Sequence, residues 1–238
     1  MPLPTLKVEI WSDIACPWCY IGKRRFEAAL ARFEHAGEVE VRWRSFELDP
    51  HAPALRPVGV VEHLAAKYGQ TPAAAQGMVD HMERMAAGEG LELHLEKTQG
   101  GNTFDAHRLL HLALERGRQH ELKDELLRAY FTAGRPVADH GALTEAAVAA
   151  GLDRAEVEAV LDGDAYAGAV RDDEEQAYAF GISAVPFFVL NRKYGVPGAQ
   201  DPEVLLNALR RAWNDQQPLE DIGAGPGDAA CEGDACAV

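Results

Sequence analysis

Hydrophobic and polar positions alternate in two short segments near the start of the chain and follow a helical period between them. Residues 6–11 (LKVEIW) alternate and include β-branched side chains, which predicts a strand. Apolar residues then recur at spacings of three to five up to Glu34, which predicts an amphipathic helix that begins near residues 16–19 and ends before Gly37. Residues 39–48 alternate again. The order strand, helix, strand predicts a βαβ unit with two parallel strands.

The next hundred residues carry a helical pattern. Strand signals disappear beyond the prolines between His51 and Pro57. Asp153 followed by Glu156 has the capping-box arrangement, which supports the start of one helix. We expect helices over residues 59–69, 71–88, 103–118, 119–133, 141–150 and 153–162. Residues 56–163 are therefore predicted to form an inserted helical domain.

The mixed α/β pattern returns near the end of the chain. A helix is predicted over 165–180, a buried strand over 187–190 (FFVL) and an edge strand over 194–196. Asp201 and Pro202 supply an N-cap and a first-turn proline for a closing helix over 202–214. The apolar period then stops, and GAGPG at 223–227 is typical of a linker. We expect residues 217–238 to form a flexible C-terminal tail.

Composition narrows the class of protein. The chain has 238 residues, of which 47% are apolar and 26% charged, and its formal net charge of -15 argues against nucleic acid as a partner. The start lacks a basic region followed by an apolar one, and no stretch approaches the roughly 18 apolar residues of a membrane span. We therefore expect a cytoplasmic protein with no membrane partner. Cytosolic thiols are normally reduced, so a closely spaced cysteine pair indicates catalysis or metal binding.

Cys16-Pro17-Trp18-Cys19 lies where the first strand meets the first helix. Backbone N–H groups of a helix N-terminus stabilise a thiolate, which makes Cys16 the expected nucleophile. Cys19 lies one turn along the same face and is expected to resolve the mixed disulfide. Pro17 fits the first turn, and Trp18 offers an aromatic surface beside the reactive sulfur.

The same spacing of two cysteines is common in zinc ribbons. A structural zinc pair normally lies in a knuckle, however, and this pair lies between a strand and an amphipathic helix. The redox interpretation is therefore favoured, with no metal ion and no cofactor expected.

Three motifs resemble one family in the right order: WSDIACPWCYIGK at 11–23, GGNTFDAHRLLHLA at 100–113 and GISAVPFFVLNRKYGVPGAQ at 181–200. The sequence is similar to the DsbA branch of the thioredoxin superfamily, in particular its cytosolic FrnE-like members. The resemblance implies an α/β fold, thioredoxin-like with a large α-helical insertion. Residues 1–55 and 164–216 would then form a discontinuous thioredoxin-like domain.

The resemblance also implies an activity and a set of substrate contacts. It implies a thiol–disulfide oxidoreductase or isomerase that acts on protein or peptide thiols and disulfides, with glutathione or a cytosolic thiol reductant as a further partner. It implies a cis peptide bond between Val185 and Pro186, facing the cysteine pair. The substrate-binding residues that we expect are Pro17, Trp18, Asn102, His107, Val185 and Pro186.

Two interpretations remain open at this point. Asn102, His107 and Arg108 resemble a family motif at the active-site cleft, but Asn102 or Thr103 could simply cap a helix, and the other two could be solvated or paired. The alternative enzyme class is a glutathione-dependent isomerase or transferase of the kappa and chromene-carboxylate-isomerase type. Those enzymes usually carry a lone Ser or Cys, so Cys19 favours disulfide exchange.

Cys231 and Cys236 form a second pair, in the predicted tail. A linker of about 16 residues gives this pair a reach on the order of 20 Å, enough to visit Cys16. We expect either a secondary redox pair that exchanges with the first, or an incidental thiol pair able to hold a soft metal. The direction of electron flow depends on reduction potentials and stays open.

Overall fold

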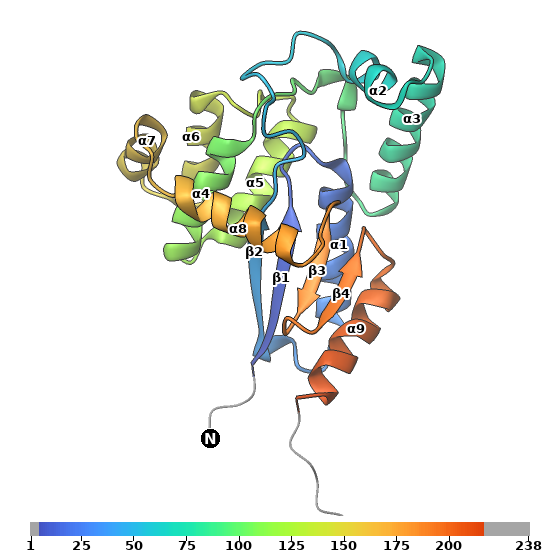
Figure 1. Ribbon diagram of the computed structural model, residues 1–238, viewed down its shortest axis with the longest axis vertical. Helices are drawn as coiled ribbons and strands as arrows, with labels where there is room; N and C mark the ends of the chain where they lie inside the picture. Colours follow the sequence, from blue (N-terminus) through green and yellow to red (C-terminus); the bar gives the residue numbers. More distant parts are fainter. Residues whose placement is uncertain (1–4, 217–238) are drawn as a thin grey trace, which may run out of the picture.

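The computed structural model describes residues 5–216 and arranges them around a four-stranded sheet (Figure 1). The strands are β1 (Leu6–Ser12), β2 (Val39–Ser45), β3 (Phe187–Leu190) and β4 (Tyr194–Pro197), in the spatial order β2-β1-β3-β4. β1 and β2 are parallel, as the βαβ pattern predicts, and the other neighbouring pairs are antiparallel. β4 lies at the edge of the sheet, which was also predicted.

Helices α1 (Pro17–Ala31) and α9 (Pro202–Asn214) cover one face of this sheet. Val8 of β1 and Leu209 of α9 are buried in the apolar cluster that joins these two helices to the sheet. Phe26 of α1 stacks on Phe188 of β3 with ring centroids 5.5 Å apart. This packing fixes α1 against the strands, so the first turn of α1 is held at the end of β1.

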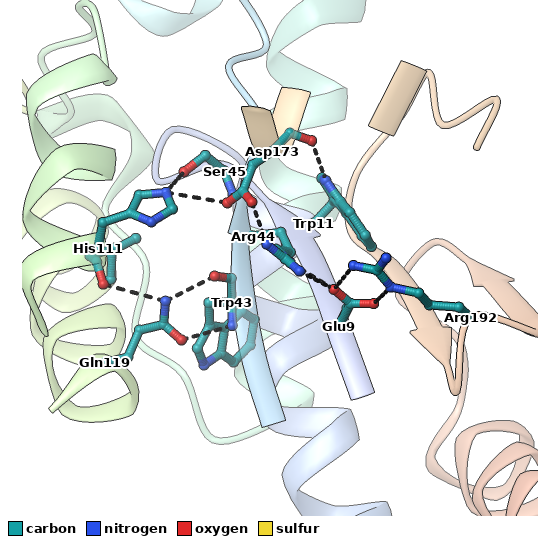
Figure 2. A network of polar contacts seen from close by, with 10 residues as sticks. Glu9, Trp11, Trp43, Arg44, Ser45, His111, Gln119, Asp173 and Arg192 are labelled. Atoms are coloured by element: carbon teal, nitrogen blue, oxygen red, sulfur yellow. Dashed lines mark hydrogen bonds and ion pairs between the residues drawn. The ribbon is translucent and has the colours of Figure 1, made fainter. Parts of the chain in front are cut away.

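Helices α4 (Phe104–Glu115) and α8 (Ala167–Ala179) pack on the other face, where a buried polar network holds them (Figure 2). The carboxylate of Asp173 accepts hydrogen bonds from Arg44 Nη1 at 2.7 Å and from the backbone N–H of Ser45 at 2.9 Å. His111 Nε2 lies 3.3 Å from the same carboxylate, and Trp11 Nε1 donates to the Asp173 carbonyl at 2.8 Å. Both helices are thereby tied to the ends of β1 and β2.

The segment between β2 and α8 is helical, as the sequence predicts. Its helices form one apolar core that also includes Ile14, Tyr20 and Ile21, so it packs directly on the loop after β1 and on α1. Besides α4, the elements of this segment are α2 (Val60–Tyr68), α3 (Pro72–Gly88), η2 (Leu95–Lys97), α5 (Gln119–Phe131), α6 (His140–Ala149) and α7 (Arg154–Asp162). The division into domains at residues 56 and 163 stays a prediction.

Some element boundaries differ from the sequence pattern. α1 ends at Ala31 rather than Glu34 because the N–H of Arg32 bonds to the carbonyls of Ala29 and Leu30, and a 3-10 turn, η1 (Ala36–Glu38), follows. β2 ends at Ser45 rather than residue 48, since the backbone N–H of Leu48 turns to the carboxylate of Asp13.

The starts of α7 and α9 agree with the N-cap residues predicted from the sequence. The Asp153 side chain accepts from the N–H of Glu156 at 3.1 Å, which confirms the predicted start of α7. Asp201 is the N-cap residue of α9 and Pro202 its first residue, although the Asp201 side chain makes no capping bond. Within residues 5–216, none of the helices combines the length and apolar character needed to cross a membrane.

Candidate active site

Cys16 and Cys19 open helix α1 directly after the loop that follows β1. Cys16 is the N-cap residue in an extended conformation, Pro17 follows at the first helical position, and the N–H of Cys19 donates to the Cys16 carbonyl at 3.0 Å. Both thiols are free; Cys16 keeps 5% of its surface exposed, and Cys19 keeps none. The two sulfurs therefore differ in access, with the one at the helix N-terminus nearer to solvent.

The environment of Cys19 favours its thiol form. Burial raises the pKa of Cys19 well above its ordinary value, and the neighbouring Cys16 adds to the rise. The buried ammonium group of Lys123 opposes this effect. Cys19 is therefore held in its protonated form in the free-thiol state.

The loop before β3 lies against Cys16. The peptide bond between Val185 and Pro186 is cis, as the family resemblance implies. The Cys16 thiol lies 3.6 Å from the Val185 carbonyl oxygen, and the Pro186 carbonyl accepts from the N–H of Gly198 at 2.8 Å. On its other side Pro186 packs on α1 at Gly22, where an added Cβ atom would lie only 2.8 Å from the Pro186 Cγ. The sequence-predicted pair Val185–Pro186 is thus brought to the sulfur of Cys16.

Trp18 and Pro17 form the partly exposed rim of the site. The Trp18 ring lies 6.2 Å from the ring of His81, an exposed residue on α3. A helix of the inserted segment therefore borders the cysteine pair. The sequence pattern gave no sign of this contact, because His81 is distant in the chain and has no neighbouring motif.

Asn102 makes its hydrogen bonds within the protein. Its Nδ2 donates to Glu47 Oε1 and to the Pro50 carbonyl, both at 3.2 Å, and its Oδ1 accepts from the N–H of Phe104 at 2.9 Å. The capping interpretation thus describes its contacts: Asn102 joins the start of α4 to the loop after β2. Thr103 is the N-cap residue by position, but its side chain makes no capping bond.

His107 is enclosed within the protein, and its expected role at the substrate site stays a prediction. None of its surface is exposed, and its Nε2 lies 3.3 Å from Oδ1 of Asp13. Arg108 is also buried and donates to the carbonyls of Gly163 at 2.6 Å and Ala165 at 2.9 Å. These contacts join α4 to the loop after β1 and to the segment before α8.

Asp13 is a buried carboxylate three residues before Cys16. It accepts from the N–H of Leu48 at 2.7 Å and from the N–H of Ala15 at 3.4 Å, besides its contact with His107. Burial alone would raise the pKa of Asp13, but the contacts with His107 and Leu48 outweigh burial and lower it. Asp13 was not among the site residues predicted from the sequence, although its place directly after a buried strand was a usable signal.

Lys123 of α5 is a second buried charged residue that was not predicted from the sequence. It is completely buried, and its Nζ lies 5.6 Å from the centre of the Trp43 ring. Burial lowers the pKa of Lys123 to about 8, and the charges of Cys19, Asp13 and Cys16 limit the fall. Its helical spacing was a signal, since it shares the buried face of α5 with Gln119 and Leu127.

Within residues 5–216, no group of three His, Cys, Asp or Glu side chains is arranged to hold a metal ion. The second predicted redox pair, Cys231 and Cys236, lies outside the described residues.

Comparison with known proteins gives consistent matches along the chain. The family of DSBA-like thioredoxin domains matches residues 7–210. The crystal structure of a probable DsbA oxidoreductase from Streptomyces coelicolor is 51% identical, covers 96% of this chain and 100% of its own, and has a TM-score of 0.85. The uncharacterized protein YwbO of Bacillus subtilis strain 168 is 29% identical over 207 residues, which are 86% of this chain and 96% of that protein.

A more distant structure has the same fold. The cytosolic disulfide reductase DsbM from Pseudomonas aeruginosa, solved with GSH, is 17% identical, covers 87% of this chain and 99% of its own, and has a TM-score of 0.62. Together these matches confirm the predicted α/β fold, thioredoxin-like with a large helical insertion. The narrower FrnE-like assignment stays a prediction.

Proposed function

This chain belongs to the family of DSBA-like thioredoxin domains, and we propose that it exchanges disulfides with protein or peptide substrates through Cys16 and Cys19. The observation that carries the proposal is the different access of two free thiols in one helical turn. Cys16 is 5% exposed at the helix N-terminus, and Cys19 is fully enclosed behind it. One sulfur can meet an external partner, and the other can meet only the first sulfur.

The reaction begins at Cys16. The thiolate form of Cys16, at the N-terminus of α1, attacks one sulfur of a substrate disulfide. A bond forms between Cys16 and that sulfur, and the other substrate sulfur leaves as a thiolate. Cys19 then attacks Cys16, which releases the reduced substrate and leaves a disulfide between Cys16 and Cys19. The same steps in reverse oxidise a dithiol substrate.

Val185, Pro186, Pro17 and Trp18 form the proposed platform for the substrate. The Val185 carbonyl lies beside the Cys16 sulfur, so an extended peptide that pairs with this backbone would bring its own sulfur to Cys16. Trp18, with His81 beside it, provides a partly exposed aromatic wall for apolar side chains. The chemistry of this platform suits an unfolded or extended polypeptide.

We further propose glutathione as a thiol partner and the cytoplasm as the compartment. DsbM, which has the same fold, is a cytosolic disulfide reductase whose structure contains GSH. A reduced-glutathione pool would return the Cys16–Cys19 disulfide to the dithiol.

Variants of the two cysteines test the main proposal. With reduced glutathione present, the wild-type protein should reduce insulin, and Cys16→Ser should abolish the activity. Cys19→Ser should instead accumulate a mixed disulfide between Cys16 and the substrate, visible by mass spectrometry. Full insulin reduction by Cys16→Ser would overturn the assignment. Glutathione-dependent conversion of an aromatic substrate, without any exchange of protein disulfides, would support the isomerase or transferase class instead.

The second pair, Cys231 and Cys236, is proposed to exchange with Cys16 and Cys19 during repeated turnover. The double variant C231S/C236S should then show slower multiple turnover with at least one reductant. Unchanged turnover under every reductant would remove this role for the tail and leave an incidental thiol pair.

A further inference from the structure

A groove lies on the face of the sheet opposite α1 and α9. Val8 and Val41 point into the core that the sheet shares with these two helices, so the alternation of the strands turns Lys7, Glu9 and Arg42 to the other face. The groove has a volume of about 610 Å³. Its lining residues are Thr5, Lys7, Val8, Glu9, Glu40, Arg42, Arg44, Asn191, Arg192 and Gln216. The groove is therefore separate from the cysteine pair and from the Val185–Pro186 loop.

The groove is basic, although the chain as a whole has a formal net charge of -15. Its lining holds two carboxylates, on Glu9 and Glu40, and four basic side chains, on Lys7, Arg42, Arg44 and Arg192. The Glu9 carboxylate accepts hydrogen bonds from both Arg44 and Arg192 (Figure 2). Within residues 5–216, the side chains of Lys7 and Arg42 form no ion pair. Their positive charges are available to a negatively charged ligand.

Two hydrogen-bond donors in this groove lack an acceptor. Arg42 Nε and Gln216 Nε2 are buried, and neither has a hydrogen-bond partner among the residues that the structure describes. A buried donor without an acceptor is unfavourable by roughly 1–3 kcal/mol. Burial and the neighbouring charge of Arg44 also lower the pKa of Arg42, as expected where positive charge is in excess. The groove thus suits a ligand that carries carboxylate oxygens.

The end of α9 brings such a ligand to the groove. Asn191 Nδ2 donates to Gln216 Oε1 at 2.7 Å, and Asn191 Oδ1 accepts from the N–H of Lys7 at 2.9 Å, so Gln216 is tied to the rim. Residues 217–238 include five acidic residues and no lysine or arginine.

The first two of these acidic residues are Glu220 and Asp221. Glu220 is four positions after Gln216, which a chain can span up to roughly 14 Å. A segment attached by so short a connection has an effective concentration in the millimolar range. It therefore has an advantage over free anions in reaching the groove.

We propose that the groove binds the acidic segment Glu220–Asp221 of the same chain, with the carboxylates against Arg42 and Lys7. Charge complementarity and the unpaired donors of Arg42 and Gln216 carry this inference, which does not depend on the proposed redox function. Docking fixes the start of the tail at the groove, so the segment that carries Cys231 and Cys236 begins its reach from there. Because the contact is between charged groups near solvent, salt should weaken it.

The first test measures 15N relaxation of the full chain at an ionic strength of about 0.01 M, where charges are screened only beyond about 30 Å. In the wild-type protein, residues 219–222 should have order parameters above about 0.6, the usual upper limit for flexible backbone. Arg42→Gln and the double variant E220Q/D221N should each bring these values below about 0.6. Salt at about 1 M should have the same effect on the wild-type protein.

Two control variants match the changes of charge. Arg84→Gln removes an exposed arginine of α3 that does not line the groove, and E232Q/D234N removes the same charge from a later part of the tail. Both should keep the wild-type order parameters at residues 219–222. Wild-type values already below about 0.6, or values that Arg42→Gln leaves unchanged, would overturn the inference.

A second measurement uses inorganic phosphate as a probe of the groove and needs no change within residues 5–216. The Nε–Hε resonance of Arg42 is followed by NMR while phosphate is added to wild type and to E220Q/D221N. Phosphate should bind at least about tenfold more weakly to wild type, because the attached segment competes for the groove. Equal affinity, or no binding to either protein, would refute the docking. Order parameters at residues 219–222 that rise with protein concentration would assign the groove to the tail of a second copy and would also refute it.

Discussion

Gly22 controls how closely the loop at Pro186 approaches the cysteine-bearing helix, and Gly22→Ala tests this contact. An added Cβ would lie 2.8 Å from Cγ of Pro186, whereas ordinary contacts begin near 3.4 Å. The two groups must therefore separate by about 0.6 Å. The proline ring is bonded to its own backbone, so the displacement passes to the Val185 carbonyl, which lies 3.6 Å from the Cys16 sulfur.

Two opposing effects set the magnitude of the change in stability. Replacement of a glycine by alanine inside a helix stabilises by roughly 0.5–1 kcal/mol. Overpacking of a close contact costs roughly 1–3 kcal/mol. The net expectation for Gly22→Ala is a loss of roughly 0.5–2 kcal/mol in the free energy of unfolding. A misplacement of about 1 Å can cost about 100-fold in rate, so a smaller shift predicts roughly a tenfold loss in kcat/KM for insulin reduction.

Gly77→Ala is the matched control, because Gly77 lies inside α3 and a Cβ there would have no neighbour within 4 Å. Urea unfolding should show that Gly77→Ala is as stable as wild type or more stable, with unchanged insulin reduction. The reaction of Cys16 with a small alkylating reagent should be similar in all three proteins. If Gly22→Ala matched Gly77→Ala in both stability and turnover, the contact with Pro186 would not position the site.

Three further predictions concern charge and the rim of the site. Asp13→Asn should lower the free energy of unfolding by roughly 1–3 kcal/mol at pH 7. Because the folded-state pKa of Asp13 is lowered, this difference from wild type should shrink as the pH falls below about 4. A difference in urea unfolding that stays constant with pH would contradict this prediction. Burial alone would raise the pKa of Glu27, but hydrogen bonds from His120 and Lys23 lower it to about 2. The stabilisation that ionised Glu27 provides should therefore be lost as the pH falls from about 4.5 to 2. Glu27→Gln should then make the temperature of thermal unfolding less dependent on pH in this acid range. Trp18→Ala should reduce kcat/KM for insulin roughly tenfold while leaving alkylation of Cys16 unchanged; equal kcat/KM would remove the aromatic wall from the substrate platform.

Much of the fold could be predicted from local patterns because those patterns are set by neighbours in the chain. Strand β3 and helix α9 lie where the apolar period places them, over residues 187–190 and 202–214. The ends of elements were less predictable because tertiary contacts decide them. β2 stops at Ser45 since the next residues turn to side chains from elsewhere: the N–H of Leu48 bonds to Asp13, 35 positions earlier.

Some residues of the candidate site could be predicted from the sequence, and the contacts of others could not. Cys16, Cys19 and the Val185–Pro186 pair could be identified because each belongs to a short contiguous motif. The contacts of His107 could not, since the sequence pattern does not distinguish a histidine that faces a cleft from one that faces a buried carboxylate. Its complete burial against Asp13 depends on how α4 packs over the end of β1.

The inserted helices contribute residues to the surroundings of the cysteine pair. Burial raises the pKa of Cys19, and a positive charge nearby makes its ionisation less unfavourable. In this chain that charge comes from Lys123. Lys123 lies on α5, a helix that also contacts β2. The inserted helices thus supply both His81 beside Trp18 and a buried lysine whose positive charge limits the rise in the pKa of Cys19. Removal or repacking of α5 should therefore alter the reduction potential of the cysteine pair even where the strands and α1 keep their positions.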